Sequence, residues 1–514
     1  MFIKVALLIA FFAVTIFVGL YFRSRADSVS GFVLAGRSVG PWLTAFAFGT
    51  SYFSAVVFVG YAGQFGWRFG TAAVWIGLAN AFIGSLLPWL ILGRRTRVMT
   101  HHLNSATMPE FFGQRYNSTA LKLGASVLVF VFLIPYTASL YNGLSRLFAM
   151  AFGVDFVFCI IAMAILTAIY VIAGGYFATA VNDFIQGIIM LVGIIAVLAA
   201  VISSNGGFTA AITGLAMVND PAVAPGAYTS FFGPDPLSLL GVMVLTSLGT
   251  WGLPQMVGKF YAIKSEKSIT IGAIISTFFS LVVAGGCYFL GSFGRLYSDK
   301  VDIAANGYDS IIPTILSGFP DALIGMIIIL VLSASISTLS SLVMASASTF
   351  TLDFLKGSII KKFSDKSQLL TIRALVVVFI IIASIIATIQ YRGGITFIAQ
   401  LMGISWGALA GSFLAPFLYG LYWKRTTSVS IWACFIFSTS LMVLNIFFRA
   451  SFPPILQSPI NAGAFAMLMG MIIVPVVSLI TPVKDKAAVE DHFSCYDETV
   501  QVKVAEDLGA GEAA

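Results

Sequence analysis

Long apolar runs are the strongest constraint on how this chain can fold. A run of about 20 apolar residues forms a helix long enough to cross the ~30 Å hydrocarbon core of a bilayer, and such runs recur along most of the sequence. Of the 514 residues, 59% are hydrophobic and only 10% are charged, which is too little charge to cover a soluble protein of this length. We therefore expect an all-α polytopic membrane protein embedded in the lipid bilayer.

Hydropathy, glycine and proline positions, and charged interruptions together predict thirteen spans. They cover residues 3–22, 41–62, 69–93, 120–149, 155–174, 180–203, 237–258, 268–294, 317–345, 370–390, 394–421, 427–448 and 460–482. The first run lacks a small-residue cleavage site behind it, so we interpret it as a span and not as a signal peptide. Residues 1–483 would form the transmembrane domain, and residues 484–514 a cytoplasmic tail.

Basic side chains predict the orientation of these spans. Lys and Arg collect in the cytoplasmic loops of membrane proteins, and an odd number of spans places the termini on opposite sides. With the N-terminus outside, 21 of the 28 Lys and Arg residues fall on the cytoplasmic side, including Lys259 just after the seventh span. The other seven are Lys4, Arg68, Arg146, Arg295, Lys300, Arg392 and Arg449. We therefore predict a multi-pass protein of the cell membrane, whose net charge of +7 reflects topology and not binding to nucleic acid.

A dense group of hydroxyl side chains, SASISTLSS at residues 333–341, lies inside the apolar run 323–343. In a helix Ser337, Ser340 and Ser341 share one face, and Thr338 lies beside it. This face could bind something small and polar. Alternatively, the hydroxyls donate to carbonyls one turn earlier and allow neighbouring helices to pack closely, as serine and threonine often do in membranes.

The second and seventh spans share an interrupted pattern. AFAFGTSYFSAVVFVGYAG at 45–63 and LTSLGTWGLPQMVG at 245–258 both contain Gly-Thr followed closely by an aromatic residue. Matched broken helices in two halves of a chain are typical of inverted-repeat transporters, in which unwound carbonyls line a cavity or bind a cation. The two repeats would cover residues 41–203 and 237–421. The alternative is that these glycines only allow close helix packing.

Asp183 places a carboxylate at the start of the sixth span. A charge near membrane depth costs on the order of 2 to 3 kcal/mol unless it is wet or paired, and no Lys or Arg is close to it in sequence. A bound cation is therefore its natural partner. Alternatively, Asp183 lies in water at the cytoplasmic end and caps the helix.

Three motifs together resemble a known family. FVLAGRSVGPW at 32–42, GGYFATAVNDFIQ at 174–186 and SISTLSS at 335–341 are similar to motifs of the solute:sodium symporter family, which includes bacterial proline, sialic acid and sugar transporters. The resemblance implies a LeuT-like fold, a 5+5 inverted repeat with one extra N-terminal helix and a short C-terminal extension. It also implies Na+ as the coupling ion.

The resemblance implies two sodium sites against the serine-rich span. The first would combine main-chain carbonyls with hydroxyls, from Thr50, Phe53, Ala334, Ser337 and Thr338. The second, present in only some relatives, would combine a carboxylate with hydroxyls, from Asp183, Ser337, Ser340 and Ser341. Oxygen ligands of this kind suit a hard cation, and we expect two sodium ions.

The solute pocket expected at the midplane offers hydrogen-bonding and stacking groups without a fixed charge. The residues are Tyr52, Ser54, Gln64, Tyr136, Thr246, Thr250, Trp251 and Pro254. Bacterial proline transporters carry an Asp at the position of Tyr52 and aromatic residues at those of Thr246 and Thr250, which disfavours proline itself. A small amino acid or carboxylate, held by helix N-termini and bound ions, is favoured over a sugar.

These patterns predict sodium-coupled uptake of a small organic solute by alternating access. Two alternatives stay open: a proton-coupled or uncoupled permease, with Asp183 as the proton carrier, and a solute-sensing membrane protein. An enzyme is not expected, because three His residues without catalytic or metal-binding spacing leave nothing to carry out a reaction. We expect the chain to act as a monomer.

Overall fold

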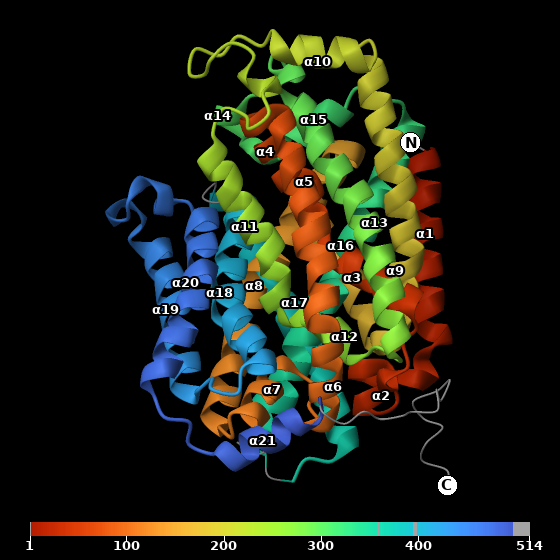
Figure 1. Cartoon of the computed structure of the whole chain (residues 1–514). Helices are drawn as coiled ribbons and strands as arrows, with labels where there is room; N and C mark the ends of the chain where they lie inside the picture. Colours follow the sequence, from red (N-terminus) through yellow and green to blue (C-terminus); the bar gives the residue numbers. More distant parts are fainter. Residues whose placement is uncertain (1, 357–358, 361, 394–397, 497–514) are drawn as a thin grey trace.

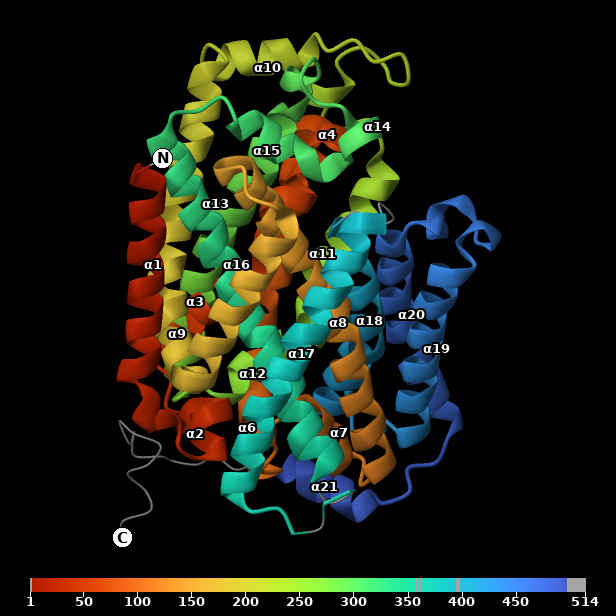
Figure 2. The ribbon, with the colours of Figure 1, turned by 180° about the vertical axis from the view of Figure 1, so that it is seen from behind.

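The computed structural model describes residues 2–356, 359–360, 362–393 and 398–496, and this part of the chain forms helices and no β-strand. Figures 1 and 2 show the helix bundle from opposite sides. We call the end that carries the N-terminus and α10 (Phe208–Ala216) the upper end. The lower end carries α2 (Val29–Leu34), α6 (Arg94–His102), α7 (Met108–Arg115) and α21 (Lys486–Ser494).

The described residues contain 10 helices that are long and apolar enough to cross a membrane, or up to 11 if the bent pair α11 (Pro236–Gly252) and α12 (Pro254–Tyr261) is one span. The chain is therefore a multi-pass, all-α protein, as predicted. Two of the 10 are runs of 47 and 49 residues, Val56–His102 and Phe156–Ser204. Either run, if straight, would measure about 70 Å, more than twice the thickness of the hydrocarbon. The count of thirteen spans stays a prediction.

Helix α9 (Phe156–Ser204) is a hairpin of two helical halves. It turns at Gly175, where φ is 56° and ψ is −167°, a conformation that favours glycine. Lys4, near the N-terminus, donates to the Ala151 carbonyl at the end of α8 (Thr119–Phe152; 3.0 Å), and α10 follows α9 at the upper end (Figure 2). Both ends of α9 therefore lie at the upper end, and its halves run in opposite directions.

The first broken helix begins as α3 (Pro41–Tyr52). It ends before Phe53, whose backbone is extended with φ −110° and ψ 111°. The chain then continues as the π-helical segment η3 (Val56–Tyr61) and as α4 (Ala62–Phe69). The predicted interruption of this span is confirmed.

The second broken helix consists of α11 and α12, which are bent by 43° relative to each other. Leu253 between them is extended, with φ −81° and ψ 123°. Pro254 opens α12 because it has no N–H to continue the hydrogen-bond ladder of α11. Both predicted interruptions are therefore present. The assignment of residues 41–203 and 237–421 as repeats stays a prediction.

The serine-rich span occupies the core of the bundle. It forms α16 (Asp321–Thr349), continues as the π-helical segment η10 (Phe350–Leu355), and is 78% buried over its apolar window, against 28% for α1 (Phe2–Tyr21). Burial inside protein suits a hydroxyl-rich helix, because polar groups in a membrane helix face the bundle interior and not lipid. The other long helices are α13 (Glu266–Ser292), α17 (Asp365–Gly393), α18 (Ile398–Tyr422), α19 (Ser428–Phe447) and α20 (Pro459–Ile480).

The chain after residue 483 packs against the lower end in its described part. Helix α21 lies across this end (Figure 1), and the ring of Phe493 is buried 4.9 Å from the Arg115 guanidinium. The Tyr496 hydroxyl donates to the Arg95 carbonyl (3.2 Å). The predicted tail is thus docked up to residue 496, and residues 497–514 lie outside the described part of the chain.

Candidate functional site

The break after α3 meets the hydroxyl-rich face of α16, where several oxygens converge. The Ser337 hydroxyl donates to Thr50 Oγ1 (2.6 Å). The Thr338 hydroxyl lies 3.2 Å from the Thr50 carbonyl and 3.0 Å from the Ala334 carbonyl. These residues, and Phe53 at the break, are all buried. We call these five residues the first cation position.

The end of α3 makes the Thr50 carbonyl available. The last hydrogen bond of this helix runs from Phe53 N to the Gly49 carbonyl (3.2 Å). Beyond it, the Thr50 carbonyl accepts from the Thr338 hydroxyl instead. Unwound backbone is tolerated at membrane depth where it lines a cavity or holds an ion, and neutral oxygens suit a hard monovalent cation. The structure thus brings the residues predicted for the first sodium site into one region.

A second group surrounds Ser341, further along α16. Its hydroxyl accepts from Lys259 Nζ (2.9 Å) and lies 2.8 Å from Ser51 Oγ. Lys259 Nζ also lies 3.9 Å from a carboxylate oxygen of Asp183, and the two side chains are 3% and 1% exposed. We call Asp183, Lys259 and Ser341 the second cation position.

The lysine at this position corrects the sequence analysis. The basic-residue pattern places Lys259 on the cytoplasmic side of the seventh span, and no Lys or Arg lies close to Asp183 along the sequence. The structure instead buries Lys259 in the core, because α12 extends to Tyr261 and brings this side chain to Asp183. A lysine so soon after Pro254, in a broken helix that continues, was the available signal. The helix-capping alternative also fails, because Asp183 lies about two turns beyond Gly175, inside the helix.

Of the other two hydroxyls predicted for a second sodium site, that of Ser340 is bound elsewhere, whereas that of Ser337 lies beside both Asp183 and Thr50. Ser340 donates to the Ser337 carbonyl (2.7 Å), and the Ser337 hydroxyl belongs to the first cation position. Of the four predicted ligands, Asp183 and Ser341 are therefore the pair that the structure joins through Lys259.

Aromatic rings gather beside the first break. The Tyr52 hydroxyl donates to the Thr246 carbonyl (2.6 Å), and the Tyr52 ring stacks on Trp406 of α18 with centroids 6.2 Å apart. Tyr136 of α8 packs edge-on against the same indole, at 5.9 Å. Ser54 is buried at the break. We call these residues the candidate solute pocket.

The other predicted pocket residues are engaged or placed elsewhere. Thr250 donates to the Gly84 carbonyl (2.8 Å) and Trp251 Nε1 to the Ile83 carbonyl (2.9 Å), so both side chains bind the π-helical segment η5 (Phe82–Leu86). Pro254 lines a cavity together with Lys259 and Ser341. Gln64 lies on α4, beyond the break. A role for these four residues in solute binding stays a prediction.

Two residues of this region were missed in the sequence analysis. Trp406 packs so closely on Gly249 that a Cβ added there would lie 2.3 Å from the indole. Asn80 Oδ1 accepts from the hydroxyls of Thr246 (2.8 Å) and Ser247 (3.1 Å). A lone tryptophan in a glycine-rich span and a lone asparagine in an apolar one were signals that could have identified them.

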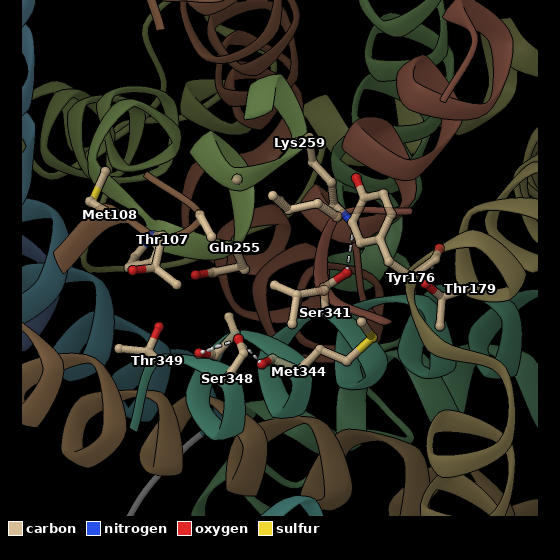
Figure 3. Close-up of a pocket in the computed structure, with 16 residues that line it drawn as sticks. Thr107, Met108, Tyr176, Thr179, Gln255, Lys259, Ser341, Met344, Ser348 and Thr349 are labelled. Carbon is tan, nitrogen blue, oxygen red and sulfur yellow. Dashed lines mark hydrogen bonds between the residues drawn. The ribbon is translucent and has the colours of Figure 1, made fainter. Parts of the chain in front are cut away.

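A cavity connects the lower part of the bundle with the second cation position. Its lining includes Thr107, at the start of α7, and Thr349, at the end of α16. Tyr176, Lys259 and Ser341 form the opposite part of the lining (Figure 3), and Lys259 Nζ lies 5.1 Å from the centroid of the Tyr176 ring. The second cation position is therefore reached from the lower end.

The upper end is tied together by charged and aromatic side chains. The Arg295 guanidinium lies between the rings of Trp67 and Tyr228, 4.4 Å from each centroid. Asp220 accepts from the Tyr228 hydroxyl (2.6 Å) and pairs with Arg295 (3.0 Å). The hydrogen bond from Tyr228, with help from Arg295, holds the pKa of Asp220 below its ordinary value. We call these four residues the Arg295 clamp.

Comparison with known sequences gives consistent matches over most of the chain. The model of the sodium:solute symporter family matches residues 32–436. The osmoregulated proline transporter OpuE of Bacillus subtilis is 27% identical over 420 residues, which cover 81% of this chain and 83% of that protein. A sodium/proline symporter of Staphylococcus aureus is 29% identical over 428 residues, which cover 81% of this chain and 80% of that protein.

Solved structures share the fold. A Na+-coupled sialic acid symporter in a substrate-bound, outward-open state has a TM-score of 0.73 at 18% identity, over 94% of this chain and 98% of that chain. The nucleobase-cation-symport-1 transporter Mhp1 has a TM-score of 0.51 at 12% identity, over 91% and 98%. Both have the LeuT fold, which confirms the predicted fold class. With the family model matching more than half of its length, this chain belongs to the sodium:solute symporter family, a family of sodium-coupled transporters and not of enzymes.

Proposed function

We propose that this chain imports a small organic solute across the cell membrane, driven by sodium and by alternating access. The observation that carries the proposal is the first cation position, where the broken α3 and α16 bring neutral oxygens together. An ion there would hold α3 against α16, and α3 also carries Tyr52 of the candidate solute pocket. Sodium binding would thus order the pocket, which is the physical basis of coupling between two sites.

The sodium gradient supplies sufficient free energy for such uptake. One sodium ion crossing about 100 mV releases about 2.3 kcal/mol, and a tenfold concentration ratio adds about 1.4 kcal/mol. Together these terms support a solute gradient of roughly several hundredfold. One ion for each solute is therefore enough for accumulation.

We infer that the lower end faces the cytoplasm, because basic side chains concentrate there. Three arginines of α6, Arg115 of α7, and Lys424, which pairs with Glu490 of α21, belong to this end, as the positive-inside rule requires. The cavity then opens towards the cytoplasm and the Arg295 clamp lies outside. The structure corresponds to an inward-facing state, in contrast to the outward-open sialic acid symporter.

A small amino acid is the solute class that the pocket supports best. Tyr136 offers a hydroxyl, and Tyr52 and Trp406 offer ring faces, none of them with a fixed charge. This suits a zwitterion whose charges are met by helix ends and a bound ion. Two relatives are named as proline transporters. Proline is therefore the first compound to test, although Tyr52 replaces the Asp of bacterial proline transporters.

Uptake into proteoliposomes tests the proposal. We expect proline or another small amino acid to accumulate with an inward sodium gradient and not with potassium. Ser337→Ala and Thr338→Ala each remove an oxygen ligand and should raise the half-saturating sodium concentration at least about tenfold, while the half-saturating solute concentration at high sodium changes less than about threefold. Ser335→Ala is the matched control, because Ser335 points to another face of α16 and donates to the Val331 carbonyl (2.7 Å).

Two results would contradict this account in different ways. Uptake driven by a proton gradient in the absence of sodium would overturn sodium coupling and favour the proton-coupled permease. Unchanged sodium affinity in both alanine variants would show that sodium binds elsewhere than at the first cation position.

A further inference from the structure

The second cation position already contains a positively charged group. Lys259 Nζ donates to the Ser341 hydroxyl (2.9 Å) and lies 3.9 Å from the Asp183 carboxylate. Both charged side chains are buried in the core of the bundle. The ammonium group therefore lies beside two of the oxygens that a second sodium ion would use.

Distance argues against a sodium ion beside this ammonium group. Hard cations bind oxygen at about 2.4 Å. A sodium ion at the Ser341 hydroxyl would therefore lie within about 5 Å of Lys259 Nζ, since that nitrogen is 2.9 Å from the same oxygen. Two like charges so close together repel strongly in a site shielded from water.

Charge balance also argues against a sodium ion at the second cation position. Asp183 and Lys259 together are neutral, and among the described residues Asp183 is the acidic side chain that pairs with Lys259. Adding a sodium ion would leave an uncompensated positive charge in the core, which is costly. Removing the ammonium would instead leave a buried carboxylate in need of a cation.

We propose that the Lys259 ammonium occupies the second cation position as a tethered cation, so that this chain couples one sodium ion, and not two, to each solute. The inference rests on the proposed sodium coupling and departs from the two-ion expectation drawn from the family resemblance. The same lysine also joins the moving parts: it lies on α12 and binds Ser341 of α16, which in turn contacts Ser51 of α3. Both broken helices are thus linked through the central one.

Equilibrium binding of radioactive sodium to the purified full-length protein, without solute, tests this proposal. We expect one sodium ion bound for each wild-type chain. Lys259→Met removes the ammonium but keeps an apolar stem, and should raise the count to two because Asp183 is freed. Lys259→Arg keeps the charge and should stay at one. The double variant Lys259→Met with Asp183→Asn should also bind one, because it lacks the freed carboxylate.

The outcomes separate this inference from the proposed function. Two sodium ions bound to the wild-type chain would overturn the tethered cation and leave sodium coupling intact, whereas no bound sodium would overturn both. A folded Lys259→Met variant that binds only one ion would also overturn the tethered cation. If that variant does not fold, the number of sodium ions bound to the wild-type chain still tests the proposal. One bound ion would support the tethered cation, and two would overturn it.

Discussion

The two ends of the bundle are held in different ways. At the upper end, the Arg295 clamp joins three segments, and α4 packs on α13 backbone to backbone: a Cβ added to Gly66 would lie 2.0 Å from the Gly291 carbonyl carbon. At the lower end, a cavity lies among parts of α2, α7, α12 and α16. Closure of the upper end therefore depends on a few close contacts, which single substitutions can remove.

Gly291→Val should disrupt this arrangement most strongly. A Cβ at this position would lie 1.8 Å from the Ala62 carbonyl oxygen, so α4 could no longer dock on α13. We expect uptake to fall at least about a hundredfold, which corresponds to about 2.7 kcal/mol, with the upper end of the protein held open. Spin labels on α4 and on η7 (Ala227–Thr229) should move apart.

Gly285→Ala is the matched control for this variant. It lies on the same helix, and a Cβ added there meets no atom within 4 Å, so uptake and label distances should match the wild type. Loss of uptake in Gly291→Val with an unchanged label distance would contradict the role of this contact in closure.

Arg295→Ala should have the next largest effect. It removes a cation that contacts two rings and one carboxylate, worth together about 1–2 kcal/mol. We expect the ratio of molecules open at the upper end to molecules closed there, measured with the same labels, to rise about fivefold to thirtyfold. Lys300→Ala is the control, because Lys300 is exposed in the same loop. Equal shifts in both variants would mean that the general loss of positive charge, and not the clamp, is responsible.

Acid should have the smallest effect on the upper end. The clamp lowers the pKa of Asp220, so its contribution is complete above the ordinary pKa of about 4 and is lost as the pH falls through the lowered value. We expect label distances to stay constant from about pH 8 to about pH 5 and to increase only below about pH 4. Asp220→Asn should remove this dependence. A transition centred near neutral pH would show that another group controls closure.

Local sequence patterns are sufficient for the fold class, whereas the residues of the first cation position were implied by the family resemblance. Apolar runs of about 20 residues have few alternatives in a bilayer. Each Gly-Thr pair lies a few residues before an extended residue, which is Phe53 in the first break and Leu253 in the second. Local patterns do place Ser337 and Thr338 on or beside one face of a regular helix, and Thr50 just before a break.

The second cation position depends on tertiary structure that no spacing reveals. Asp183 and Lys259 come from different helices, and they approach to 3.9 Å because the chain turns back at Gly175 and continues as a helix past its second break. Similarly, Thr250 and Trp251 bind carbonyls of η5. A π-helical segment points its carbonyl groups in other directions than an ideal α-helix does. A regular helical wheel therefore does not predict which side chains reach them.

The hairpin form of α9 also affects how the protein is made. Its two halves are joined at one residue and contain no Lys or Arg, so we infer that they enter the membrane together as the ribosome delivers them. Asp183 is then inserted before Lys259 has been synthesised. At about 5–20 residues per second, the carboxylate waits several seconds for its counter-charge. The newly made first half of the transporter must therefore keep this carboxylate hydrated until α12 arrives.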